Sequence, residues 1–158
     1  MQKIRTCLWF DDDALDAAKF YCSIFKDAKV LDVQRYSDAG PGKKGTVMAI
    51  VWKMAGQEFQ AINGGPIFPL TEAVSLSVRC KDQKEVDDYW KKLLRGGGTP
   101  SQCGWLKDRY GLSWQIVPEP FAKKMKSRNE KKVASMFRAM FTMQKLDLKK
   151  LEAAYERG

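Results

Sequence analysis

The chain has 158 residues, of which 44% are hydrophobic and 30% charged, as in ordinary globular proteins. No apolar run approaches the ~20 residues that span a bilayer, and the first residues begin a strand pattern with no signal-peptide core. We therefore expect a cytoplasmic protein that does not enter a membrane. The net charge is +9, but residues 1–120 carry 17 basic and 15 acidic side chains, whereas residues 121–158 carry 11 and 4. The tail's basic residues alternate with apolar ones at helical spacing, as on a solvated helix face, which argues against nucleic-acid binding.

The first half of the chain predicts one helix and four strands. Asp11, Asp12 and Asp13 are candidates to cap a helix over residues 14–25, in which apolar residues recur at helical spacing. Apolar and β-branched runs predict strands over residues 4–10, 30–36, 46–54 and 58–62. The order of elements is βαβββ.

The second half predicts the same order. A strand over residues 73–78 precedes a helix that begins after Asp82 and ends at Gly96. Three short strands then follow over residues 99–103, 105–109 and 112–117. Helical spacing resumes in the tail, first at Val133, Met136, Phe137 and Met140, then at Leu148, Leu151 and Tyr155.

Histidine is absent, and the four cysteines form no CxxC pair, so the chain offers no familiar zinc spacing. Cys7 and Cys80 lie in apolar strand patterns and are expected to be buried, whereas Cys103, among Gly and Ser, is expected to be more exposed.

Several segments resemble a known family. They are Leu8–Asp11 with Ala17–Tyr21, Gln60–Pro66, Val74–Val78, Glu85–Trp90 and Gly104–Pro118. With two tandem βαβββ units, they resemble the PhnB-like branch, or 3-demethylubiquinone-9 3-methyltransferase domain, of the vicinal oxygen chelate superfamily, which includes glyoxalases, bleomycin-resistance proteins and dioxygenases. The resemblance implies an α+β fold whose curved, cup-like mixed sheet comes from tandem βαβββ units. A domain over residues 1–118 is expected, with unit 1 at about 1–63 and unit 2 at about 73–118, followed by a basic helical extension over 119–158.

Two strands of the second half alternate cleanly between apolar and small polar residues. Ser75 and Ser77 share one face of the first strand, and Ser113 and Gln115 share one face of the second. Small uncharged polar groups are typical of a shielded cleft in which hydrogen bonds select a ligand. The alternative is that these groups satisfy one another inside the core.

Four residues of the first half complete the predicted ligand site. Trp9 and Phe59 are expected to form its apolar wall and Asn63 its rim. Arg5 at the mouth would favour an anionic or carbonyl-bearing ligand, unless it is a plain surface charge.

The resemblance also implies a metal held by one ligand from each of four strands. The matching positions are Arg5, Phe59 or Gln60, Ala73 or Glu72, and Gln115. Because arginine is cationic and Phe and Ala lack donor atoms, only Gln115 is clearly able to bind a metal, and we expect neither a metal nor a cofactor. No glycine-rich loop joins a strand to a helix as in Rossmann-type methyltransferases.

The sequence thus predicts a metal-independent protein that binds a small polar or aromatic molecule. One alternative is a metal-independent lyase, isomerase or transferase, and another is an interaction module that docks a partner through its helical tail. We expect a homodimer, because the stripe Val133, Met136, Phe137 and Met140 needs a surface to cover it.

Overall fold

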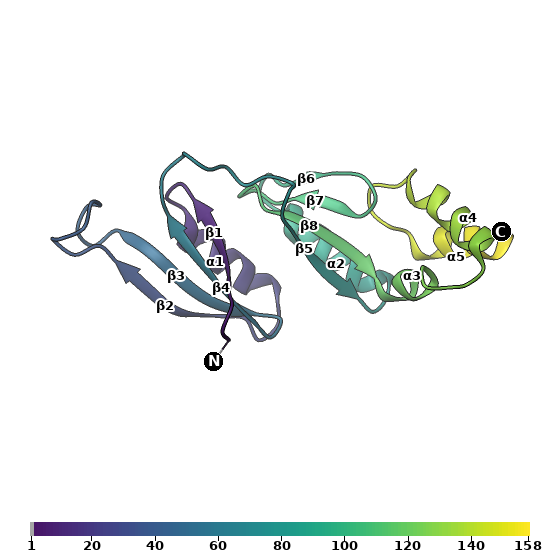
Figure 1. Ribbon diagram of the computed structural model, residues 1–158, viewed down its shortest axis with the longest axis horizontal. Coiled ribbons are helices and arrows are strands. Elements are labelled where there is room, and N and C mark those ends of the chain that lie inside the picture. The colour runs from purple at the N-terminus through teal and green to yellow at the C-terminus, as the bar shows by residue number, and fades with distance from the viewer. Residues whose placement is uncertain (1) are drawn as a thin grey trace. The chain divides into compact units, whose positions relative to one another are not determined.

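The computed structural model describes residues 2–158, which divide into two compact units with a boundary between Leu70 and Thr71 (Figure 1). Each unit contains one four-stranded mixed sheet with a helix against one face. The α+β class and the repeated βαβββ order that the sequence predicts are confirmed. Among residues 2–158, no helix is both long and apolar enough to cross a membrane.

The sheet of unit 1 has the strand order β1-β4-β3-β2. Strands β1 and β4 are parallel, and the β4–β3 and β3–β2 pairs are antiparallel. The elements are β1 (Thr6–Phe10), α1 (Ala14–Ile24), β2 (Lys29–Arg35), β3 (Val47–Met54) and β4 (Gln57–Asn63).

The core of unit 1 lies between α1 and one face of this sheet. Alternate residues of β3 and β4 face the helix, so Trp52 and Phe59 are buried with their rings stacked 5.5 Å apart. Three small residues of α1, Ala14, Ala17 and Ala18, are fully buried, which allows the helix to pack closely on the sheet. The other face of the sheet is left open within this unit.

This alternation corrects the expectation for Cys7. Leu8 and Phe10 are buried under α1, so Cys7 belongs to the open face of β1 and is exposed. Cys80, by contrast, is fully buried as expected, and burial raises the pKa of its thiol to about 12.

The start of α1 is capped from an unexpected place. Asp13 occupies the N-cap position, but its side chain makes no capping hydrogen bond. Instead the Asn63 Oδ1 atom, at the end of β4, accepts a hydrogen bond of 3.0 Å from the Ala14 backbone N–H. The Asn63 amide nitrogen donates to the carbonyl oxygens of Asp12 and Val47 at 3.0 and 3.2 Å. Asn63 therefore fixes the helix to the sheet.

The sheet of unit 2 has the equivalent order β5-β8-β7-β6, with β5 and β8 parallel. Its elements are β5 (Ser75–Cys80), α2 (Gln83–Leu94), β6 (Thr99–Pro100), β7 (Trp105–Lys107) and β8 (Ser113–Pro118). Asp82 caps α2 as expected, accepting from the Glu85 backbone N–H at 2.9 Å.

The strand predicted over residues 99–103 is wrong beyond Pro100. Cys103 and Gly104 both have positive φ angles, of 58° and 86°, which bend the chain out of the sheet. Their backbone N–H groups donate at 2.7 Å to the carbonyl oxygens of Met143 and Gln144 in the tail. The Ser101 N–H group donates to the Trp105 carbonyl oxygen at 2.8 Å, so residues 101–104 form the turn into β7, and the tail contacts this turn.

The tail forms three helices, α3 (Glu119–Lys124), α4 (Glu130–Met140) and α5 (Leu148–Arg157). They enclose a small core of Phe121, Met136, Leu146 and Leu151, against which Val117, Ala139, Met140, Met143, Leu148 and Tyr155 pack. Met136, the centre of the apolar stripe predicted on α4, is fully buried in this core. The chain itself therefore covers much of the stripe that was expected to need a second copy.

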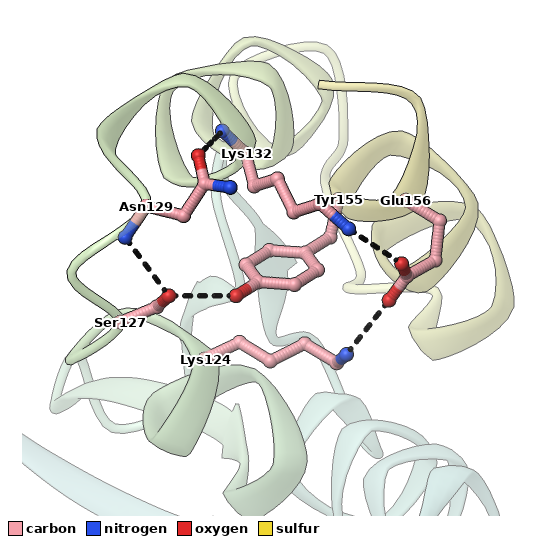
Figure 2. A network of polar contacts seen from close by, with 6 residues as sticks. All are labelled: Lys124, Ser127, Asn129, Lys132, Tyr155 and Glu156. Atoms are coloured by element: carbon pink, nitrogen blue, oxygen red, sulfur yellow. Dashed lines mark hydrogen bonds and ion pairs between the residues drawn. The ribbon is translucent and has the colours of Figure 1, made fainter.

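A network of polar side chains connects the three tail helices (Figure 2). The Glu156 carboxylate accepts from the Lys132 and Lys124 ammonium groups at 2.8 and 3.4 Å, and these lysines lie 5.3 and 4.3 Å from the centre of the Tyr155 ring. The Tyr155 hydroxyl donates to Ser127 Oγ at 2.7 Å. The last turn of α5 is thereby fixed to the segment between α3 and α4.

Candidate functional site

A cavity of about 270 Å³ lies on the open face of the unit 1 sheet. It is lined by residues from all four strands or their immediate flanks: Arg5, Leu31, Asp32, Gln34, Ala49, Val51, Glu58 and Gln60. The strand pairing explains this set, since Asp32, Val51 and Gln60 are neighbours in one row across the sheet, and Gln34 and Ala49 are neighbours in the next. The cavity thus combines apolar, amide and charged side chains.

An ion pair forms one end of the cavity. The Arg5 Nε–H group donates to Glu58 Oε2 at 2.7 Å, and both side chains are part-buried, with 32% and 24% of their surface exposed. The Glu58 backbone is held by Gln2, whose amide oxygen accepts from the Glu58 N–H at 2.8 Å. Arg5 therefore lines this cavity, and part of its charge is balanced by Glu58.

The other end of the cavity is formed by the edge strand β2. The register shift between Val30 and Asp32 is a bulge that lets both Leu31 and Asp32 line the cavity. Gln34 donates from its amide nitrogen to Asp32 Oδ2 at 3.1 Å. Among residues 2–158, no lysine or arginine lies within 4.0 Å of the Asp32 carboxylate.

The other residues predicted for this half lie elsewhere. Phe59 is buried under α1, on the opposite face of the sheet from the cavity, because its strand parity is that of Ala61 and not of Gln60. Asn63 uses its amide to cap α1. Trp9 is on the open face but donates from its indole nitrogen to the Gly65 carbonyl oxygen at 2.8 Å, with the Phe68 ring 5.0 Å away. Trp9 therefore supports the connector after β4.

The polar residues predicted in unit 2 do share one face of their sheet. Ser75 pairs in register with Ser113, and Ser77 with Gln115. The Gln115 amide nitrogen donates to Ser75 Oγ at 2.8 Å, so these two groups satisfy one another in part. Ser113 is only 1% exposed, and its Oγ atom has no hydrogen-bond partner among the described residues. A buried hydroxyl without a partner is costly, and this polar face is consequently a second candidate surface.

Charged groups beside this face have defined partners. Lys107, which pairs in register with Ser113, forms an ion pair of 2.5 Å with Glu72, and this contact holds the pKa of the Glu72 carboxyl below its usual value. Asp108 is buried and accepts from the Tyr110 and Leu112 backbone N–H groups at 2.9 and 3.1 Å and from Trp114 Nε1 at 2.8 Å. Asp108 is therefore the centre of the turn between β7 and β8.

The positions that match the superfamily's metal ligands do not form a donor set. Arg5 is paired with Glu58, Glu72 with Lys107, and Gln115 with Ser75. Within residues 2–158, no three His, Cys, Asp or Glu side chains lie close enough together to hold a metal ion. A divalent catalytic centre normally needs about three protein ligands and an open position. These residues do not fit such a centre.

The residues that the sequence reasoning missed are Asp32, Gln34 and Glu58. The signal was available in the alternation of β3, where Ile50, Trp52 and Met54 face α1. That assignment places the alternate residues of β3 on the open face of the sheet, together with the residues of β2 and β4 that pair with them.

Comparison with known proteins identifies the family. A sequence model described as 3-demethylubiquinone-9 3-methyltransferase matches residues 2–117. A solved structure from Bacillus cereus, a putative 3-demethylubiquinone-9 3-methyltransferase called PhnB protein, is 36% identical with a TM-score of 0.67, and the match covers 74% of this chain and 99% of that one. A comparison with proteins of curated function finds no match.

More distant structures share the fold. A Pseudomonas aeruginosa protein has a TM-score of 0.62 at 18% identity, over 75% of this chain and 98% of that one. The fosfomycin resistance protein FosX from Listeria monocytogenes, solved with Mn(II) and sulfate, has a TM-score of 0.54 at 14% identity, over 80% and 98%. The chain belongs to the 3-demethylubiquinone-9 3-methyltransferase family.

Proposed function

We propose that this protein binds a small molecule in the unit 1 cavity and does so without a catalytic metal. The observation that carries the proposal is the cavity itself, about 270 Å³ in volume, which joins apolar side chains to an arginine, two carboxylates and two amides on one rigid sheet. Ligand sites combine apolar walls with polar groups that orient the ligand, and this cavity offers three apolar and five polar or charged side chains. Metal independence is supported by the ion pairs and hydrogen bonds that occupy the matching ligand positions.

The methyl transfer in the family's name has no support from the described residues. Gly64 and Gly65 follow β4 but lead into a connector, and Gly96, Gly97 and Gly98 end α2 and lead into β6. Neither run joins a strand to a helix start, where a nucleotide-like cofactor's phosphates or carboxylate would be held. We therefore propose binding, and no methyl transfer, as the function.

The polar face of unit 2 is proposed as a second ligand-contacting surface, formed by Ser75, Ser77, Ser113 and Gln115. Support comes from the buried Ser113 hydroxyl without a partner and from the shared face of the four side chains. A ligand group that reaches Ser113 Oγ would remove its desolvation penalty of about 1–3 kcal/mol.

The tail is proposed as a structural layer of unit 2. Its backbone accepts hydrogen bonds from Cys103 and Gly104, and Lys145 forms an ion pair of 2.6 Å with Asp87 on α2. The interaction-module alternative has no comparable observation behind it.

The test is ligand-induced thermal stabilisation of the full chain across a panel of metabolites. Gln60→Leu, which changes only a cavity-lining amide, should abolish the stabilisation by any hit that binds in the unit 1 cavity. The matched control Gln57→Leu changes an exposed glutamine at the start of the same strand and should leave it unchanged. Hits that survive Gln60→Leu would move the site away from this cavity. One transition metal per chain in elemental analysis would contradict metal independence.

A further inference from the structure

The charges of the unit 1 cavity are separated across the sheet. Glu58 pairs in register with Lys53, and Lys53 with Lys29, so these three charges lie in one row on the open face of the sheet. Arg5 lies beside Glu58. Asp32 lies in the next row, with Val51 and Gln60. That row is net cationic, although only Arg5 and Glu58 of it line the cavity, and the next row carries a single carboxylate.

Both Arg5 and Asp32 keep unused hydrogen-bonding capacity. Arg5 engages Glu58 through its Nε atom, and its two terminal nitrogens have no hydrogen-bond partner among residues 2–158. A guanidinium with both terminal groups available matches the geometry of a carboxylate or similar anion. Asp32 accepts from Gln34 at Oδ2, which leaves its Oδ1 atom available to a donor.

We propose that the cavity binds a zwitterionic small molecule, with its ammonium group on Asp32 and its carboxylate or other anionic group on Arg5. This inference rests on the proposed function and adds the chemical class of the ligand. Val51 lies in the row of Asp32, on the strand next to β2, and Leu31 and Ala49 line the cavity beside Asp32 and Gln34, so these three side chains would contact the apolar part of the molecule.

The strand order sets the length of the ligand. Asp32 is on β2 and Arg5 precedes β1, and these strands are three inter-strand steps apart in the order β1-β4-β3-β2. Three steps amount to about 14 Å between backbones. A ligand that contacts both side chains must therefore be an extended molecule that reaches across β4 and β3.

The probes are 6-aminohexanoate, hexylamine and hexanoate, which differ only in their charged ends. Each is titrated into the ¹⁵N-labelled full chain, and the amide signals of Asp32, Val51 and Gln60 are followed. We expect 6-aminohexanoate to bind at least about fivefold more tightly than either single-charge probe, since each end adds a charge-assisted contact.

Two variants separate the ends, and each has a matched control in the exposed Lys44–Asp38 pair, which does not line the cavity. Asp32→Asn should weaken 6-aminohexanoate about fivefold and leave hexanoate unchanged, whereas Asp38→Asn should change neither. Arg5→Gln should weaken hexanoate by a similar factor, whereas Lys44→Gln should not.

The outcomes distinguish the two proposals. If hexylamine or hexanoate binds as tightly as 6-aminohexanoate, or if Asp32→Asn has no effect, the zwitterion assignment is wrong and small-molecule binding in the cavity stands. If none of the three probes shifts the cavity amides and no metabolite stabilises the protein, both proposals fail.

Discussion

We expect the packing of the tail helices against the rest of unit 2 to depend on Leu146. It is 1% exposed in the tail core, and its backbone carbonyl oxygen accepts from the Gln83 amide nitrogen at 3.1 Å. The Gln83 amide oxygen in turn accepts from the Leu148 backbone N–H at 2.8 Å. The side chain also packs against Gly104, where an added Cβ would lie 3.0 Å from Leu146 Cγ. Removing this side chain should loosen both the tail core and the bend at Gly104.

Leu146→Ala should lower the free energy of unfolding by about 3 kcal/mol, within the 2–5 kcal/mol typical of buried Leu→Ala changes. For a chain of this size, that corresponds to a fall in Tm of roughly 6–12 °C. Urea unfolding followed by tryptophan fluorescence and calorimetry would measure it. Ile67→Ala, at a residue that is 68% exposed, is the matched control and should stay within about 0.5 kcal/mol. A loss below about 1 kcal/mol for Leu146→Ala would refute the view that the tail is part of the unit 2 core.

Four further predictions concern the site and the assembly. Gln115→Leu should change stability by less than about 1 kcal/mol in urea unfolding, because the lost bond to Ser75 is partly offset by the apolar replacement; outright unfolding would show a structural network. Asp108→Asn should cost about 2–3 kcal/mol by the same measurement and shift Trp114 fluorescence, since an amide cannot accept all three bonds; an unchanged midpoint would contradict its role in the turn. Lys132 holds the pKa of the Glu156 carboxyl below its usual value. The contribution of Glu156 to stability is therefore present above the ordinary glutamate pKa and is lost as pH falls through the lower pKa of the folded state. The Tm difference between wild type and Glu156→Gln should be clear at pH 7 and vanish in strong acid. Light scattering should give about twice 18.0 kDa, because each sheet leaves one face open within its own unit and Ile67 and Phe68 are exposed; a monomeric mass would exclude the dimer.

The fold was predictable because the local signals agree with the tertiary structure. Helical spacing in 14–25 and period-two alternation in 112–117 each match the element that forms, and the Asp82 cap is where the pattern places it. The shortened strand at 99–103 was not predictable from its own residues. The strand ends in a turn closed by the Ser101–Trp105 hydrogen bond, and this turn also donates hydrogen bonds to Met143 and Gln144, about 40 residues further along the chain.

The site was predictable only where strand parity could be assigned correctly. The shared face of the four polar residues of unit 2 follows from the alternation of their own strands. Phe59 was placed on the wrong face because β4 offers two plausible parities, and only its pairing with Trp52 on β3 decides between them. The position of Asp32 in the cavity depends on a bulge in β2, and strict alternation of side chains along a strand does not predict a bulge.

If the protein binds its ligand without a metal, as we propose, the ion pairs of Arg5 and Glu72 would account for it, because they occupy positions that match the expected metal ligands. In a metal centre, the cation attracts an anionic ligand and orders the side chains around it. Here Arg5 supplies a fixed positive charge at the mouth of the cavity, and Glu58 orders its side chain through Nε while leaving the terminal nitrogens available. An arginine cannot lower the pKa of a bound water or polarise a substrate as strongly as a divalent cation. On the proposed function, the site would keep the recognition of an anionic group and lack a Lewis acid, which favours binding over catalysis.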